Sequence, residues 1–216
     1  MDNALNIIEL FASVQGETSF TGLPTYFVRL AACNLRCTWC DTTYSFGRGT
    51  PYSLDEITAK ITESGITAVC VTGGEPLLQQ NVHLLMRHLC NRGHKVSLET
   101  SGSLSTKAVD PRVSVILDIK CPGSGMEAKN LWENLEWLKP ADEVKFVIKD
   151  ETDFEYAKEV CQRYSLFRKV NNVLFSPVYG AMDSQLLVAW ILRDKLPVRL
   201  NLQMHKFIWS PDTKGV

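Results

Sequence analysis

The stretch Thr25-Tyr-Phe-Val-Arg-Leu-Ala-Ala-Cys33-Asn-Leu-Arg-Cys37-Thr-Trp-Cys40 joins an apolar, aromatic run to a loop that holds three of the seven cysteines. The run Thr25–Leu30 is typical of a buried strand. The three thiols follow at spacings of three and two intervening residues. Active-site residues of α/β folds gather at the carboxyl ends of strands. This stretch therefore predicts an α/β fold with a reactive cysteine loop at the end of an early strand.

Similar β-rich runs recur along the chain and alternate with helical patterns. Several of these runs are nearly continuous apolar segments, as expected for strands that are buried on both faces of a parallel sheet. We expect strands at Ile7–Phe11, Ala68–Thr72, Lys95–Glu99, Val113–Ile119, Glu143–Ile148, Asn172–Phe175 and Val198–Gln203.

The helical segments between these runs have recognisable ends. Ser53-Leu-Asp-Glu56 matches a capping box, and Gly65 is a favourable residue for ending the helix that starts there. We expect further helices over Gln79–Asn91 and Asn130–Leu138, and two that open at Asp150 and Asp183. Strand–helix alternation indicates an α/β fold with right-handed crossovers. A full eight-unit barrel typically needs about 250 residues, so the 216 residues predict a partial (open) TIM-like barrel in a single domain, residues 1–216.

Composition excludes several classes of function. Lys plus Arg number 23 and Asp plus Glu 24, so the net charge of -1 gives no general attraction to nucleic acid or to anionic membranes. The apolar run Leu186–Leu192 is too short to span a bilayer, and residues 1–9 lack the basic start of a secretion signal. We therefore expect a cytoplasmic protein with no nucleic-acid or membrane partner, whose cysteines act as thiolates rather than in disulfides.

Three clustered thiolates are compatible with three kinds of chemistry. A tetrahedral zinc site needs a fourth ligand, and the next histidine, His83, lies in an expected helix far along the chain. A redox pair would use Cys37 and Cys40 but leaves Cys33 without a role. An iron–sulfur cluster fits best because three cysteines leave one iron open for a ligand. Zinc and a redox pair remain alternatives at this point.

The cysteine spacing, with the aromatic Trp39 before the last cysteine, resembles the radical S-adenosylmethionine (SAM) superfamily. The resemblance implies that Cys33, Cys37 and Cys40 hold a [4Fe-4S] cluster whose open iron binds SAM, beside Trp39. It also implies a reductant such as flavodoxin, and radical chemistry that the cofactors carry out while the protein positions the substrate.

Val71-Thr-Gly-Gly-Glu-Pro76 ends the next expected strand and resembles the GGEP element of the same superfamily. Glycines let the backbone approach a ligand closely, and the resemblance implies that Gly73, Gly74 and Glu75 contact the amino end of SAM. It places further SAM contacts at the ends of later strands, at Ser101, Asp118, Lys120, Ser176, Pro177, Val178 and Tyr179.

The opening segment Ser13-Val-Gln-Gly-Glu17 and the closing Leu202-Gln-Met-His-Lys206 narrow the resemblance to the family of 7-carboxy-7-deazaguanine synthases. That resemblance implies a homodimeric lyase that contracts the ring of 6-carboxy-5,6,7,8-tetrahydropterin and releases ammonia, in 7-deazapurine (queuosine) biosynthesis. The Thr42 hydroxyl would bind Mg²⁺. The pterin would contact Val14, Gln15, Gly16, Glu17, Arg29, Thr72, His205 and Val216.

The expected contacts make chemical sense at both ends of the pterin. Glu17 would accept from the 2-aminopyrimidine edge, where a carboxylate can take two N–H donors, and Arg29 would meet the substrate carboxylate in a forked geometry. No protein general base is apparent. Two alternatives are a glycyl-radical-enzyme activating protein, in which Glu17 and Arg29 would have no clear role, and a zinc-binding structural module.

Overall fold

The computed structural model describes residues 3–211 and 213–216, and within them the strands form a single nine-stranded sheet. Its order is β3-β1-β2-β4-β5-β6-β7-β8-β9. The strands are β1 (Ala4–Val14), β2 (Pro24–Leu30), β3 (Thr50–Ser53), β4 (Ala68–Gly73), β5 (Lys95–Thr100), β6 (Ser114–Ile119), β7 (Glu143–Ile148), β8 (Asn172–Pro177) and β9 (Arg199–Leu200).

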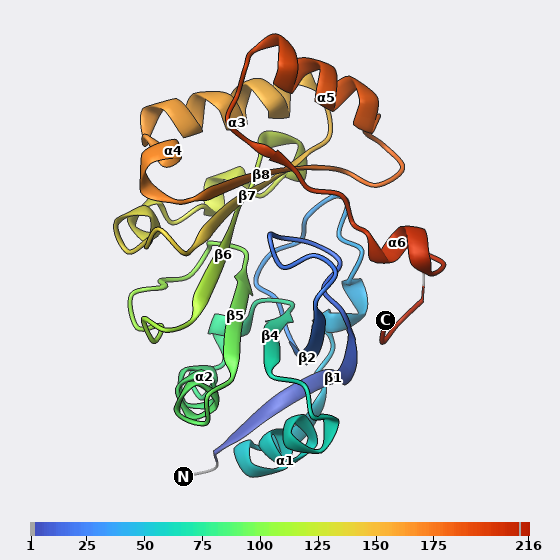
Figure 1. The fold of residues 1–216 in the computed structure, drawn as a ribbon, viewed down its shortest axis with the longest axis vertical. Helices are drawn as coiled ribbons and strands as arrows, with labels where there is room; N and C mark the ends of the chain where they lie inside the picture. The colour runs from blue at the N-terminus through green and yellow to red at the C-terminus, as the bar shows by residue number, and fades with distance from the viewer. Residues whose placement is uncertain (1–2, 212) are drawn as a thin grey trace.

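Seven of these strands run parallel and follow one another in chain order. From β2 through β4, β5, β6, β7 and β8 to β9 every neighbouring pair is parallel. β1 pairs antiparallel with both β2 and β3 and so extends the sheet at one edge. Figure 1 shows the strands following an open arc with α1 to α5 along its outside and α6 beside the C-terminus. The predicted partial barrel is confirmed, and all parallel strands present their carboxyl ends at the same edge.

The helices are α1 (Leu54–Ser64), α2 (Val82–Asn91), α3 (Glu151–Arg163), α4 (Leu166–Lys169), α5 (Ser184–Arg193) and α6 (His205–Ile208). The predicted capping box is present at α1: Ser53 accepts from the backbone N–H of Glu56, and Glu56 accepts from the backbone N–H of Ser53. Gly65 ends α1 in the left-handed conformation.

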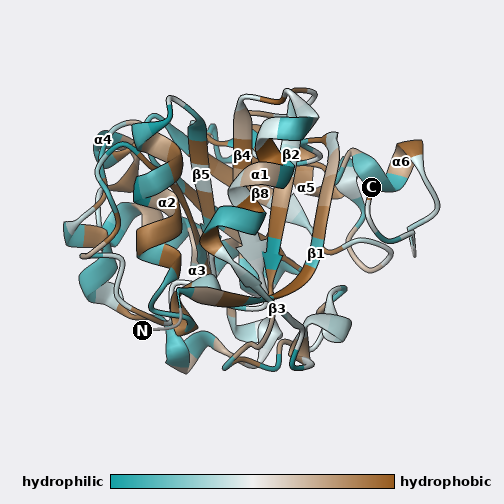
Figure 2. Cartoon of the chain, turned by 90° about the horizontal axis from the view of Figure 1, so that it is seen from below, coloured by the Kyte–Doolittle hydropathy of each residue, from teal (hydrophilic) through white to brown (hydrophobic). Residues whose placement is uncertain are grey.

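Two apolar clusters fill the space between the sheet and its helices. One joins β1, β2, β4 and β5 to α1 and α2, and includes Val28, Ile57 and Leu85. The other joins β6, β7 and β8 to α3, α4 and α5 around Phe146 and Phe154. In Figure 2, α2 carries both brown and teal, as expected for a helix with one face on the sheet. The clusters fix the strand ends that carry the polar residues.

Several short elements differ from the sequence prediction. β3 was not expected, and the predicted strand Val198–Gln203 is only Arg199–Leu200, an edge strand that pairs on one side with β8. The expected helix Asn130–Leu138 is a 3₁₀ turn over Trp132–Glu136. None of the described helices is long and apolar enough to cross a membrane.

Candidate active site at the carboxyl edge of the sheet

A cavity of about 750 Å³ opens at the carboxyl ends of the parallel strands. Its walls come from the segment after β1, the cysteine loop, the ends of β2 and β4 to β7, and the C-terminal tail. Most of the residues singled out from the sequence line this one cavity. They are Val14, Gln15, Gly16, Glu17, Arg29, Cys33, Cys37, Trp39, Cys40, Thr42, Thr72, Gly73, Gly74, Ser101, Asp118, Lys120, Val178, Tyr179, His205 and Val216.

Three of the predicted contact residues lie behind the cavity wall. Glu75 is fully buried, and its carboxylate accepts from the backbone N–H groups of Leu77 and Ser101 and from the Thr100 and Ser101 hydroxyls. The Ser176 hydroxyl exchanges hydrogen bonds of 2.7 Å with Asn201. The adjacent Pro177 is buried. Their proposed contacts with SAM stay predictions.

The cysteine loop is fastened to its neighbours by backbone hydrogen bonds rather than by regular structure. The N–H of Ala32 donates to Ser45 at 2.7 Å, and the N–H of Thr38 donates to Ser124, in the loop after β6, at 3.1 Å. Burial raises the pKa of the Cys33 and Cys37 thiols. Metal binding at this loop would therefore have to displace protons, as thiolate ligation generally does.

The glycine pair after β4 packs directly against the start of that loop. A Cβ atom on Gly74 would lie 2.0 Å from the Ala32 carbonyl oxygen and 2.8 Å from the Cys33 Cβ. Gly73 has a φ of 145°, and a Cβ there would lie 2.3 Å from the Leu30 carbonyl oxygen. Glycine is needed at both positions because the backbone of the turn packs directly on the backbone of the end of β2 and of the cysteine loop, which leaves no room for a Cβ atom.

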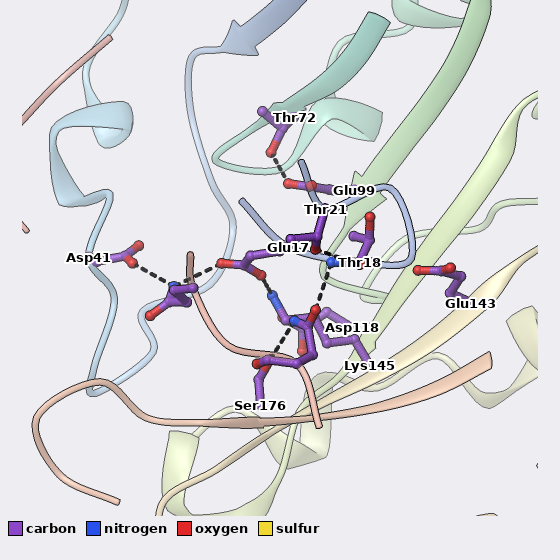
Figure 3. Close-up of polar contacts among 12 residues, drawn as sticks. Glu17, Thr18, Thr21, Asp41, Thr72, Glu99, Asp118, Glu143, Lys145 and Ser176 are labelled. Carbon is purple, nitrogen blue, oxygen red and sulfur yellow. Dashed lines mark hydrogen bonds and ion pairs between the residues drawn. The ribbon is translucent and has the colours of Figure 1, made fainter. Parts of the chain in front are cut away.

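Glu17 and Lys145 form an ion pair on one wall of the cavity (Figure 3). The Gln203 amide also donates to Glu17, at 2.8 Å. Burial alone would raise the pKa of Glu17, but the Lys145 ammonium and the two hydrogen bonds hold it below its ordinary value. Glu17 is therefore ionised at neutral pH and presents a carboxylate to the cavity.

The C-terminal tail is tied to the opening segment and to the cysteine loop. Lys206 and Gln203 both bond Asp41, at 2.7 and 3.3 Å, and the backbone N–H of Met204 donates to Gly16 at 2.8 Å. Residues at the two ends of the described chain thus enclose one side of the cavity.

Histidine 205 packs directly on the opening segment. A Cβ on Gly16 would lie 2.2 Å from the Nδ1 atom of His205, so the ring requires glycine at that position. Burial lowers the pKa of His205, which keeps its ring neutral at neutral pH.

Arg29 is held on β2, four strands away from Lys145 on β7. Its Nε donates to Glu9 at 2.8 Å, and the Tyr44 hydroxyl donates to the same carboxylate oxygen. Burial raises the pKa of Tyr44, helped by Glu9, to about 12 even though Arg29 opposes the shift. Arg29 and Lys145 thus place two cations on different walls of the cavity.

Sequence reasoning missed several lining residues, above all Lys145, Glu99 and Tyr44. Glu99 accepts from Thr72 at 2.9 Å and from Gln15 at 3.2 Å, which joins two predicted residues. The signal for Lys145 was present in Glu143-Val-Lys-Phe-Val-Ile148, since a charged residue alternates there with apolar ones. That alternation turns the charge toward the face opposite the core.

The cysteines and their surroundings suit an iron–sulfur cluster and SAM. Thiolates are the ligands that iron–sulfur clusters use, and three of them line the same cavity as the glycine turn. The Asp118 Oδ1 atom is buried without a hydrogen-bond partner among the described residues, which leaves an acceptor for a ligand. In the described part of the chain no three His, Cys, Asp or Glu side chains, the three loop cysteines included, are grouped closely enough to hold one metal ion as they stand, so this grouping favours neither zinc nor an iron–sulfur cluster.

Comparison with known proteins first identifies the class of protein to which this chain belongs. A model of the radical SAM superfamily matches residues 28–164, which include the cysteine loop and the glycine turn. The fold resembles the crystal structure of QueE from Escherichia coli with a TM-score of 0.77 and 24% identity, covering 94% of this chain and 95% of that chain.

Two relatives that align over nearly their full length then identify the family within that class. The 7-carboxy-7-deazaguanine synthases of Koribacter versatilis and Chlorobaculum tepidum are both 46% identical to this chain. Each alignment covers 98% of this chain, with 100% and 97% of the respective relative. The chain belongs to the 7-carboxy-7-deazaguanine synthase family of the radical SAM superfamily, a family of enzymes that carry a [4Fe-4S] cluster and use SAM.

Proposed function

We propose that this chain converts 6-carboxy-5,6,7,8-tetrahydropterin to 7-carboxy-7-deazaguanine and ammonia. The two products together contain all the atoms of the substrate, so the reaction needs no net oxidant or reductant. The observation that carries the proposal is that the opening segment around Glu17 and the three-cysteine loop line the same cavity. An enzyme of this class needs that arrangement because the reacting C–H bond must lie beside the cofactor.

Cys33, Cys37 and Cys40 would hold the cluster, whose fourth iron would bind SAM. When bound, the cluster and SAM supply the hydrogen-atom abstraction at C6 of the pterin and return the hydrogen after the ring has contracted. Other lining residues would shape the SAM site: Trp39, Gly73, Gly74, Ser101, Asp118, Lys120, Val178 and Tyr179. Glu75 and Ser176-Pro177 would act on that site from behind its wall.

The chain would hold the pterin from its two ends. Glu17 accepts hydrogen bonds from the 2-aminopyrimidine edge, and its ionised state, maintained by Lys145, makes it a strong acceptor. Arg29, on another strand of the sheet, binds the 6-carboxylate. Gln15, positioned by its bond to Glu99, and Thr72, bonded to the same carboxylate, support the ring between these ends.

Thr42 would contribute a hydroxyl to Mg²⁺. Its hydroxyl already donates a hydrogen bond to the neighbouring Asp41 carboxylate at 2.9 Å. Two oxygen atoms that can ligate a cation therefore lie at this point of the cavity rim. Mg²⁺ typically keeps several waters and takes few protein oxygens. Substrate oxygens would complete its coordination.

The tail would exclude water from the site. Val14, Gly16, His205 and Val216 all line the cavity, and the ion pair of Lys206 with Asp41 keeps the tail on the cysteine loop. Excluding water limits side reactions of reactive intermediates and strengthens the polar contacts within the site.

We further propose that residues 1–216 act as one radical SAM domain in a cytoplasmic homodimer reduced by flavodoxin. Light scattering of the purified protein measures the number of subunits. Reduction by flavodoxin in place of a chemical reductant tests the electron donor.

The proposed activity is tested by reconstituting the protein anaerobically with iron and sulfide and supplying SAM, reductant, Mg²⁺ and 6-carboxytetrahydropterin. Mass spectrometry should detect 7-carboxy-7-deazaguanine, and the Cys37→Ala variant should form none. Failure of the fully loaded wild-type protein to form the deazaguanine would refute the proposal.

A further inference from the structure

Lys145 is a largely buried cation in the middle of β7 that none of the predicted contacts accounts for. Its neighbours Val144 and Phe146 are fully buried in the core, and the two-residue period of the strand turns Lys145 to the opposite face, into the cavity. Its side chain is 15% exposed. Its register partner on β6 is Asp118, which lines the same cavity.

The ammonium of Lys145 has spare hydrogen-bonding capacity. Among the described residues its one recorded partner is Glu17, whereas an ammonium carries three N–H donors. Burying an ion pair is costly and is weak evidence for a purely stabilising role. The unused donors lie in a cavity that a substrate must enter, so a ligand acceptor is the expected partner.

The charge of Lys145 decides which role it can take. Burial would lower its pKa, but the Glu17, Asp118 and Glu99 carboxylates raise it above the ordinary value. The side chain is therefore a permanent cation at neutral pH and has no lone pair to act as a base. The role that remains for Lys145 is that of a fixed hydrogen-bond donor.

The pyrimidine edge of a pterin carries two N–H donors, at the 2-amino group and at N3, followed by the C4 carbonyl oxygen. Each Glu17 oxygen accepts one bond in the protein, from Gln203 at Oε1 and from Lys145 at Oε2. Each oxygen therefore retains a lone pair for an incoming N–H. The carboxylate and the adjacent ammonium present two acceptors and a donor, the pattern complementary to that edge.

We propose that Lys145 donates a hydrogen bond to the C4 carbonyl oxygen of the pterin and, with Glu17, selects 4-oxo over 4-amino pteridines. The inference rests on the proposed function for the class of substrate. A 4-amino group would direct N–H donors at the ammonium, and a site built to bond one group discriminates strongly against a ligand that lacks it. A purely structural Lys145 would instead affect both kinds of pteridine equally.

The experiment measures binding of two probes to the anaerobically reconstituted full chain with SAM. The probes are pterin-6-carboxylate and 2,4-diaminopteridine-6-carboxylate, which differ at position 4 and in consequence at N3, where only the 4-oxo probe carries an N–H. Their fluorescence reports binding. The variants are Lys145→Met and Lys145→Gln, and Lys158→Met serves as a matched control because Lys158 pairs with Glu155 and Asp194 on the outside of the fold.

Wild-type protein and Lys158→Met should prefer the 4-oxo probe. In both Lys145 variants the 4-oxo probe should bind about 10- to 100-fold more weakly, the range expected for a lost bond to a charged group. The 4-amino probe should weaken far less, so the preference shrinks by about the same factor, and the remaining preference comes from the bond between N3–H and Glu17. If the Lys145→Met variant does not fold, the Lys145→Gln variant provides the test, because its amide can still donate a hydrogen bond to Glu17 and so preserve that contact.

Equal loss of both probes, or no loss of either, would overturn the assignment of Lys145 while leaving the proposed function intact. A wild-type protein that binds both probes equally well would do the same. If wild-type protein binds neither probe and forms no deazaguanine, the proposed function itself has failed, and the inference fails with it.

Discussion

Replacing Gly74 by Ala should uncouple the cysteine loop from the sheet. The new Cβ would lie 2.0 Å from the Ala32 carbonyl oxygen, whereas real Cβ atoms essentially never come closer than 3.0 Å to such an atom. The two backbones must therefore separate by about 1 Å. Because the backbone fixes the position of the new Cβ and the oxygen belongs to the Ala32 backbone, no side-chain rotation can relieve the clash.

The energetic cost follows from what that separation breaks. The backbone N–H of Glu75 donates to the same Ala32 carbonyl at 2.8 Å, and a shift of this size removes the bond. Overpacking of this kind costs about 1–3 kcal/mol, and a buried donor left without a partner adds about 1–3 kcal/mol. We expect a loss of about 3 kcal/mol, which lowers Tm by about 6–12 °C for a chain of this length.

The assay combines thermal unfolding with iron and sulfide analysis after reconstitution. Gly74→Ala should lose stability and most of its cluster, because Cys33 directly follows Ala32. Gly47→Ala is the matched control: its φ is an ordinary -67°, and the nearest atom to the new Cβ is 3.6 Å away. A Gly74→Ala protein with wild-type Tm and a full complement of iron would refute the reasoning.

Four further changes test other parts of the account. Phe154→Ala removes a fully buried ring that packs against two aromatic neighbours, and should cost about 3–5 kcal/mol in urea unfolding with the iron content per folded chain unchanged. Gly16→Ala should push His205 away and weaken binding of pterin-6-carboxylate about 10-fold, again without loss of iron. The pKa of Glu17 is lower in the folded chain than its ordinary value of 4.5, so the ionised Glu17 stabilises the fold above about pH 4.5. This stabilisation is lost as the pH falls toward the folded-state pKa. The Glu17→Gln variant should therefore show a shallower decline of the urea midpoint between pH 5 and pH 3 than the wild-type protein. Thr42→Val should raise the Mg²⁺ concentration needed for half-maximal product formation about 10-fold, and an unchanged Mg²⁺ dependence would remove Thr42 from the metal site.

The long elements could be predicted because local sequence determines them. The apolar run of β2, the capping box of α1 and the alternation of strands with helices each follow from periodicity within a few residues. That alternation places successive strand ends at one edge of the sheet. It is why Cys33, Gly73 and Asp118, which are far apart in the chain, line one cavity.

The short elements could not be predicted because tertiary contacts create them. β3 has four residues, one of them Pro51, and forms only by pairing with β1. α6 is a single turn after Met204, whose N–H is anchored to the opening segment at Gly16. Neither segment is long enough to show a period.

The pairing of Glu17 with Lys145 shows the same limit within the site. The two residues are 128 positions apart, and no local pattern connects them. The family resemblance drew attention to Glu17 alone. The structure adds the cation that keeps Glu17 ionised, and with it a prediction about which pteridines the site accepts.

The most direct test of the central claim, that one cavity serves both SAM and a pterin undergoing ring contraction, is a mass balance of the complete reaction. The reconstituted enzyme should form one 7-carboxy-7-deazaguanine and one ammonia for each pterin consumed, with the amount of SAM unchanged over many turnovers. Cleavage of SAM to 5′-deoxyadenosine in proportion to pterin loss, or without any deazaguanine, would contradict the claim.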